Sequence, residues 1–379
     1  MKKKILFVID NIEFGGGERV FLQLADGLMH QFQVLVASMP GGTFQKKLNS
    51  LGLRLFPVDM TRQFSWKPIR QLKDIIRNEK IDLLHSQGTR ADFFTRVAGK
   101  LSRIPHIICT VTMPVEGFDV GPIRKGIYRC ADRLSERYVD RFIVVSDYLR
   151  NILIDRRGLP PESVIRIYNG IELDHYRSHV EVEPASLRDQ WNIPRDVPLI
   201  GAVGRMVWQK GLKYLIQAAP AIQKASPEVW FLFVGEGPLR PDLQSLAQQL
   251  NVHDRAVFTG FRSDIQQILS AIDILVAPSL LEGFPMITLE AMAMSKPIVA
   301  TQIQGIVEQI SDEEEGLLVP SHNHKALAGA VVRLIRDKNL SLRVGAAARR
   351  KVETCFSVQK MIRETAKVYL SLPQRNYSV

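Results

Sequence analysis

Pro278-Ser279-Leu280-Leu281-Glu282-Gly283-Phe284-Pro285-Met286-Ile287-Thr288-Leu289-Glu290 follows the short apolar run Ile274-Leu275-Val276. The apolar run predicts a buried strand, and Pro285 suits the first turn of a helix that continues to Met294. Amides at the start of that helix point toward any anion or hydroxyl above the end of the strand. Glu282 lies just before this helix, and Glu290 lies inside it among apolar residues.

A carboxylate in an apolar helix costs several kcal/mol unless it is paired or hydrogen-bonded. Glu290 therefore needs a partner. Vicinal ribose hydroxyls would serve, and a structural arginine is the alternative.

The same alternation of short apolar runs and longer segments of helical period extends along the chain in both directions. The expected strands are 5–9, 34–36, 81–84, 107–112 and 142–145, then 199–203, 230–234, 257–258, 274–276 and 297–300. Such alternation predicts doubly wound parallel sheets. Because a chain of 379 residues exceeds what one core usually supports, we expect two Rossmann-like domains.

Residues 174–198 are rich in polar residues and proline, and they predict a linker between the domains. We place the amino-terminal domain at 1–180 and the second at 181–357. Ligands of open parallel sheets bind outside the carboxyl ends of the strands, so two facing sheets would form an interdomain cleft.

Two cations follow the expected strand 199–203, within Gly204-Arg205-Met206-Val207-Trp208-Gln209-Lys210-Gly211. A planar guanidinium and a mobile ammonium together suit a diphosphate, the first through paired bonds and the second as a point charge. Two solvated surface charges are the alternative.

A glycine run, Gly15-Gly16-Gly17, follows the first expected strand and precedes a segment of helical period. Glycines at a helix start let backbone amides approach an anion. The consecutive glycines lack the spacing of a dinucleotide fingerprint, so a phosphate or sugar contact and a plain tight turn both remain open.

Composition limits the location of the chain. The three cysteines, Cys109, Cys130 and Cys355, are far apart and suit a reducing cytosol. The basic start is followed by too short an apolar run for a signal peptide, and no run is long enough to span a bilayer.

Residues 1–178 hold 28 Lys and Arg against 19 Asp and Glu, whereas the rest hold 22 against 20. The first half therefore suits an anionic partner.

One segment of this basic half combines cations with aromatic residues: Arg62, Phe64, Trp66 and Lys67. That mixture is typical of a membrane interface, and an ordinary helix start is the alternative. A second candidate for attracting acceptor phosphates is the loop that begins at Met113, which precedes a helical segment with arginines.

The motifs together resemble those of the retaining glycosyltransferases of family 4, which have the GT-B architecture. Gly204-Arg205, Lys210-Gly211 and two glutamates separated by seven residues carry the resemblance. It extends over nearly the whole chain, from the glycine run through Ile167-Tyr168-Asn169-Gly170-Ile171-Glu172 and Val234-Gly235-Glu236-Gly237-Pro238. It implies that Arg205 and Lys210 bind the donor diphosphate, Glu282 the sugar and Glu290 the ribose. Gly16, Gly17, Gly283, Phe284 and Met286 would complete the donor site. It also implies that residues 358–379 return to the amino-terminal domain.

The chain departs from the family pattern on the acceptor side. Many relatives carry a histidine where this chain has Thr112, and the second histidine of a His-x-His pattern is here Gln87, two residues after His85. These departures affect sugar orientation and the choice of donor or acceptor. We expect His85 to be structural.

We therefore expect a retaining hexosyltransferase that moves a sugar from a nucleoside-diphosphate sugar to a glycan or lipid-linked acceptor in cell-envelope or exopolysaccharide synthesis. We expect no cofactor, no metal and no nucleic-acid partner, since no Asp-x-Asp site or recognition motif is present. The protein would be cytoplasmic and peripheral on the inner face of the membrane. A noncatalytic nucleotide-sugar-binding partner of an assembly complex and a nucleotide-sugar epimerase are the alternatives.

Overall fold

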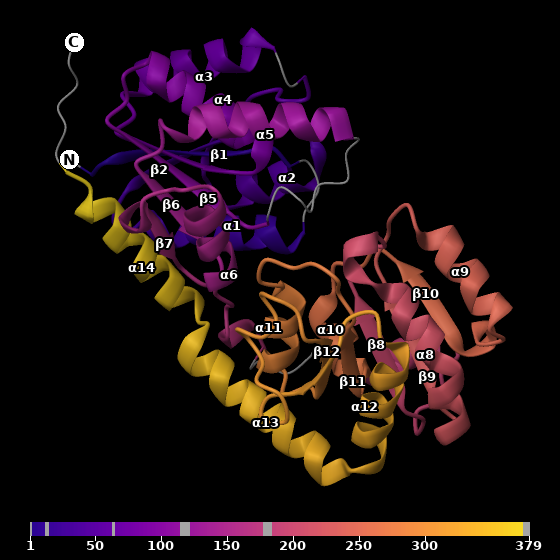
Figure 1. The fold of residues 1–379 in the computed structure, drawn as a ribbon. Helices are drawn as coiled ribbons and strands as arrows, with labels where there is room; N and C mark the ends of the chain where they lie inside the picture. The colour runs from indigo at the N-terminus through magenta and orange to yellow at the C-terminus, as the bar shows by residue number, and fades with distance from the viewer. Residues whose placement is uncertain (1, 12–14, 63–64, 114–121, 177–183, 374–379) are drawn as a thin grey trace. The chain divides into compact units, whose positions relative to one another are not determined.

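The computed structural model describes residues 2–11, 15–62, 65–113, 122–176 and 184–373, and the chain divides into two compact units (Figure 1). The first unit comprises residues 1–170 and 358–379, and the second comprises residues 171–357. The second unit thus begins ten residues earlier than the expected boundary between residues 180 and 181.

The first unit is built on a parallel sheet of seven strands among the described residues, in the order β3-β2-β1-β4-β5-β6-β7. These strands are β1 (Lys4–Ile9), β2 (Gln33–Ser38), β3 (Arg54–Pro57), β4 (Leu83–Gln87), β5 (His106–Val111), β6 (Arg141–Val144) and β7 (Val164–Arg166). The helices are α1 (Gly16–Leu28), α2 (Gly42–Ser50), α3 (Trp66–Glu79), α4 (Thr89–Leu101), α5 (Pro122–Glu136), α6 (Asp147–Asn151) and α14 (Val358–Ser371), with the short η2 (Ile152–Arg156) and η3 (Pro161–Ser163).

The burial of strands and of helix faces explains why the apolar pattern of the sequence predicts them. The five residues of β1 from Ile5 to Ile9 are at most 1% exposed, as expected for a parallel strand covered on both faces. Helix α1 turns Val20, Phe21 and Leu24 toward the sheet at helical spacing. Helices α3, α4 and α5 lie side by side in one layer (Figure 1).

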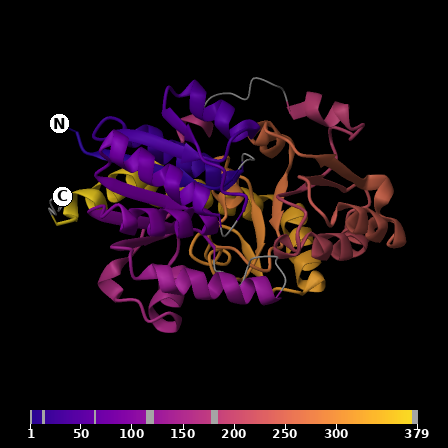
Figure 2. The same cartoon turned by 90° about the horizontal axis from the view of Figure 1, so that it is seen from above.

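The carboxyl-terminal helix α14 belongs to the first unit and packs against α1 (Figures 1 and 2). Its Tyr369 is fully buried, and the Tyr369 ring meets the Phe32 ring edge-on with centroids 5.6 Å apart. The Tyr369 hydroxyl is hydrogen-bonded to Nδ1 of His85 on β4. Helix α14 is therefore tied to the sheet by both apolar packing and a buried polar contact.

The second unit has a parallel sheet of six strands among the described residues, in the order β10-β9-β8-β11-β12-β13. These strands are β8 (Leu199–Val203), β9 (Trp230–Val234), β10 (Ala256–Gly260), β11 (Ile274–Ala277), β12 (Ile298–Thr301) and β13 (Leu317–Val319). The helices are α7 (Pro184–Gln190), α8 (Leu212–Ala225), α9 (Arg240–Gln249), α10 (Ile265–Ala271), α11 (Met286–Ala293), α12 (His324–Arg336) and α13 (Lys338–Cys355), with the short η4 (Asp174–Tyr176), η5 (Trp208–Lys210) and η6 (His253–Arg255).

Part of the expected linker 174–198 is integral to this second unit. Helix α7 packs against α10. The Arg188 guanidinium on α7 is buried and donates to the carbonyl oxygens of Ala271, at 2.8 Å, and Val197, also at 2.8 Å. Composition predicted a linker because the segment is rich in polar residues and proline. It does not show that one arginine satisfies several buried carbonyl groups.

Candidate active site

The site is set by the strand order of the second unit. Strand β8 pairs with β9 on one side and with β11 on the other. The chain therefore leaves β8 in one direction across the sheet and returns to its other side at β11. A crevice outside the carboxyl ends of such strands is where open parallel sheets bind ligands. The two motifs singled out in the sequence begin at these two strand ends.

The loop after β8 carries the two cations. Arg205 is exposed, and its guanidinium forms no ion pair or hydrogen bond with any residue that the structure describes. Lys210 ends η5, and its side chain is 24% exposed. Gly211 has φ +58, and an added Cβ would lie 2.0 Å from the carbonyl oxygen of Pro278. Glycine is thus required where the loop after β8 touches the loop after β11.

The loop after β11 places Glu282 against the lysine. The Lys210 Nζ lies 2.6 Å from Oε1 of Glu282, and the Ser279 hydroxyl donates to the same oxygen at 2.8 Å. Glu282 is 5% exposed and Ser279 is 3% exposed. A buried carboxylate needs such partners. The structure therefore brings together two of the residues that the sequence assigned to one site.

Helix α11 begins immediately after this loop, with Pro285 as its N-cap rather than in its first turn. The side chains of Phe284 and Met286 are buried, and the Phe284 ring packs edge-on against Phe356. Only the backbone of Phe284 is then suited to a ligand. Glu290 lies on the second turn of α11 and is 4% exposed.

Three polar residues that the sequence reasoning missed hold the backbone around α11. The Thr301 hydroxyl at the end of β12 donates to the Ser279 carbonyl oxygen. The Gln309 amide donates to the Pro285 carbonyl oxygen at 2.9 Å, and the Thr288 hydroxyl donates to the same oxygen at 2.8 Å. The signal for Thr301 was its position directly after an apolar run; nothing in the sequence links Gln309 to Pro285.

The first unit shows where the glycine run lies. Gly15 caps α1, and the Gly15 amide donates to Oε2 of Glu18 at 2.9 Å. Gly16 and Gly17 form the first turn of α1, and the Gln87 side-chain amide donates to the Gly17 carbonyl oxygen at 3.3 Å. The candidate acceptor-side residue Gln87 is therefore bonded to the glycine turn. A carboxylate three residues after the cap was the overlooked signal for Glu18.

The other acceptor-side candidates, Thr112 and Met113, are partly buried just after β5. The structure shows neither residue bound to Gln87. His85 is buried on β4, and its Nε2 lies 2.6 Å from the Thr110 hydroxyl. Burial lowers the pKa of His85 to about 3. His85 is accordingly a neutral structural residue, in agreement with the sequence-based expectation.

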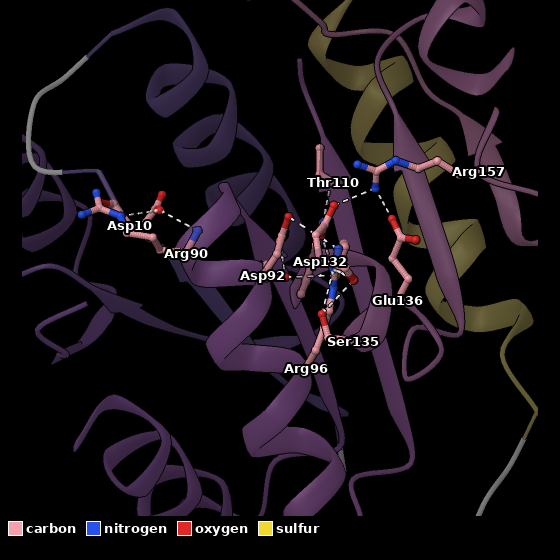
Figure 3. Close-up of polar contacts among 12 residues, drawn as sticks. Asp10, Arg90, Asp92, Arg96, Thr110, Asp132, Ser135, Glu136 and Arg157 are labelled. Atoms are coloured by element: carbon pink, nitrogen blue, oxygen red, sulfur yellow. Dashed lines mark hydrogen bonds and ion pairs between the residues drawn. The ribbon is translucent and has the colours of Figure 1, made fainter. Parts of the chain in front are cut away.

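A buried ion cluster joins α4, α5 and Arg157, which directly follows η2 (Figure 3). The Arg96 Nη1 is 2.5 Å from Oδ1 of Asp132, and the Arg157 Nη1 is 2.6 Å from Oδ2 of the same carboxylate. Arg157 also pairs with Glu136, and Arg96 lies 3.8 Å from Asp92. The cluster thus contains three carboxylates and two guanidinium groups.

The carboxylates of this cluster differ in their titration. Burial raises the pKa of Asp92 to about 7, despite the nearby Arg96 guanidinium and the Ser86 hydroxyl, which donates to Asp92 at 2.6 Å. Burial also acts to raise the pKa of Asp132, but Arg96 and Arg157 together hold it below its usual value. A proton on Asp92 makes the cluster electrically neutral.

The membrane candidates lie around the start of α3. Arg62 and Lys67 are exposed, and Trp66 is 73% exposed. Phe64 lies outside the described residues. The Ser65 hydroxyl accepts from the Lys67 amide at 3.3 Å, as a helix cap does. An ordinary helix start and an exposed aromatic residue therefore coexist here.

No helix in the described ranges is long and apolar enough to cross a membrane. No group of three or more His, Cys, Asp or Glu side chains in those ranges is arranged to hold a metal ion.

Comparison with known proteins identifies the family. The family model described as "Glycosyltransferase Family 4" matches residues 14–175. The family model described as "Glycosyl transferases group 1" matches residues 185–351. The chain belongs to family 4 of the glycosyltransferases, and its two Rossmann-like units are those of the GT-B fold.

Relatives with known activities include two enzymes that act on lipid-linked substrates. The UDP-Gal:alpha-D-GlcNAc-diphosphoundecaprenol alpha-1,3-galactosyltransferase of Escherichia coli is 26% identical over 370 residues, which cover 94% of each chain. The N,N'-diacetylbacillosaminyl-diphospho-undecaprenol alpha-1,3-N-acetylgalactosaminyltransferase of Campylobacter jejuni is 29% identical and covers 80% of this chain and 82% of its own length.

Among solved structures, HepE of Anabaena in complex with UDP and glucose superposes with a TM-score of 0.86. It is 23% identical, and the match covers 98% of this chain and 100% of HepE. At this identity the likeness establishes the fold.

Proposed function

We propose that this chain transfers a hexose from a nucleoside-diphosphate sugar to a glycan or lipid-linked acceptor in cell-envelope or exopolysaccharide synthesis. The observation that most directly supports this proposal is the 2.6 Å contact between Lys210 Nζ and Glu282 Oε1, in the loops after β8 and β11. The exposed Arg205 lies in the same loop as Lys210. A cation pair suits the diphosphate, and a held carboxylate suits sugar hydroxyls. The undecaprenol-linked substrates named for two relatives support the lipid-linked class of acceptor.

In this proposal the second unit binds the donor and the first unit binds the acceptor through Gln87, Thr112 and Met113. Departure of the nucleotide places additional negative charge on the diphosphate. Arg205, Lys210 and the amides at the start of α11 would stabilise that charge. Because protein cations do this, the proposed reaction needs no metal or other cofactor. Retention of configuration is part of the proposal and is supported by family membership.

A donor screen tests the proposal. Purified protein is incubated with UDP- and GDP-sugars, with and without undecaprenyl-diphosphate sugars, in buffer containing EDTA, and nucleotide release and the anomeric configuration of the product are measured. We expect release that rises when acceptor is added and a product with the donor's configuration. Sugar interconversion without release would show an epimerase, and binding without turnover would show a noncatalytic partner. Either result contradicts the proposal.

Peripheral attachment to an anionic bilayer is the second part of the proposal. Arg62 and Lys67 lie on either side of the exposed Trp66 in the sequence. Each basic residue near an anionic surface contributes about 1 kcal/mol to the free energy of membrane binding. We expect sedimentation with vesicles containing anionic lipid at low salt, less sedimentation as salt rises, and little with neutral vesicles.

The variant Arg62→Glu/Lys67→Glu should sediment less than wild type. Lys224→Glu/Lys338→Glu, at exposed positions at the end of α8 and the start of α13, changes the net charge by the same amount and is the control. Wild-type protein that stays in the supernatant with anionic vesicles at low salt would contradict the attachment and favour an acceptor that is not membrane-bound.

A further inference from the structure

The two oxygens of the Glu282 carboxylate have different surroundings. Both recorded donors, the Lys210 ammonium at 2.6 Å and the Ser279 hydroxyl at 2.8 Å, meet Oε1. No residue that the structure describes bonds to Oε2. An ionised carboxylate accepts several hydrogen bonds, so Oε2 retains the capacity to accept from a ligand hydroxyl.

The two donors also differ in their freedom to move. The Lys210 side chain is 24% exposed and carries a compact charge on a flexible stem. A diphosphate carries more negative charge than one carboxylate, so it draws the ammonium toward itself. Ser279, by contrast, is 3% exposed and only three residues before Glu282. Its hydroxyl can remain on Oε1 when Lys210 turns toward a phosphate.

Contacts with β12 and with the segment that follows it hold the backbone of Ser279 and Glu282 in place. The Thr301 hydroxyl donates to the Ser279 carbonyl oxygen and lies 3.4 Å from that of Ala277. Gly305 has φ +85, and an added Cβ would lie 2.9 Å from the Glu282 carbonyl oxygen. The loop therefore packs directly against this segment, which limits the movement of Ser279 and Glu282.

We propose that Ser279 is a positioning residue for sugar transfer: it holds Glu282 by Oε1, with Oε2 directed to the donor sugar, while Lys210 binds the diphosphate. This inference rests on the proposed function, because it requires a nucleoside-diphosphate sugar in the site. It assigns to Ser279 no contact with the substrate. Its effect is therefore specific to the sugar portion of the donor.

Calorimetry with UDP, GDP and their glucose and galactose conjugates provides the test, together with kcat and KM for transfer. In Ser279→Ala we expect Kd for the free nucleotide to stay within about twofold. The ratio of the nucleotide-sugar Kd to the nucleotide Kd should rise at least about fivefold, and kcat should fall about tenfold, since a hydrogen bond to a charged group is lost. Ser279→Thr retains the hydroxyl and should restore most of both values.

Ser270→Ala is the matched control, because the Ser270 hydroxyl donates to a backbone carbonyl oxygen, that of Gln267, in the same unit. It should leave all constants unchanged. The proposal is overturned if Ser279→Ala keeps the wild-type ratio and kcat, or if it weakens nucleotide and nucleotide sugar equally and threonine fails to rescue. Wild-type protein that binds none of the nucleotides would overturn the proposed function as well, so the two failures are distinguishable.

Discussion

Replacing Arg96 with methionine is expected to lower the free energy of unfolding by about 3–5 kcal/mol, the usual cost of removing one partner from a buried ion pair. The Arg96 side chain is 2% exposed, and its Nη1 lies 2.5 Å from Oδ1 of Asp132. Without Arg96, three carboxyl groups remain with the single guanidinium of Arg157. Methionine retains much of the apolar volume, so the loss measured by denaturant unfolding reports mainly on the charge.

Two further variants make the Arg96 result specific. The Arg54 side chain is 61% exposed, and Arg54→Met removes its ion pair with Glu79. This change should cost less than about 1 kcal/mol. Asp92→Asn should also cost little at neutral pH, because burial raises the pKa of Asp92 to about 7 and its neutral form is already populated. An Arg96→Met protein as stable as Arg54→Met would show that the cluster contributes no net stability.

The sign of the Asp92 effect can be checked by pH. A carboxyl group whose pKa is higher in the folded than in the unfolded protein favours folding most at low pH, and this contribution is lost as pH rises through about 7. Unfolding of Asp92→Asn should therefore lack that part of the pH dependence. The Asn variant is a control for the Arg96 prediction because it leaves the two guanidinium groups paired with Asp132 and Glu136.

Most strands that the sequence predicted are buried, and the partly buried edge strand β10 was predicted from the apolar pair Val257-Phe258. Strands β1 and β8 are continuous apolar runs because helices cover both of their faces. Strands β3, β7 and β13 escaped prediction because they have only three or four residues and lie at or beside sheet edges. Partners on one side and partial exposure leave such strands without a distinctive apolar pattern.

The candidate site was predictable only in part. Local spacing identified Lys210 and Glu282 as chemically useful residues, but their 2.6 Å contact depends on the pairing of β8 with β11, which are more than 70 residues apart. The support of Ser279 by Thr301 likewise depends on the position of β12. The bond from Gln87 to Gly17 requires β1 and β4 to be neighbours. Contacts across the sheet follow from strand order, which the periodicity of one segment does not specify.

Removing either cation of the second unit is expected to weaken nucleoside-diphosphate binding. Arg205→Ala and Lys210→Ala should each cost about 1.5–3 kcal/mol, or roughly ten- to a hundredfold in Kd, since each removes charge-assisted bonds to phosphate. Calorimetry with UDP and GDP measures the loss. Lys224→Ala, at the opposite end of α8 from Lys210, is the matched control and should bind as wild type.

The two variants should differ in stability, which separates binding from folding. The Arg205 guanidinium forms no ion pair or hydrogen bond within the described ranges, so its loss should leave the unfolding free energy within about 0.5 kcal/mol of wild type. Loss of Lys210 removes the ammonium partner of the buried Glu282 and should cost about 1–3 kcal/mol. A bound diphosphate brings no cation to Glu282, so saturating nucleotide should not erase this difference. Unchanged nucleotide affinity in both variants would remove these residues from the donor site.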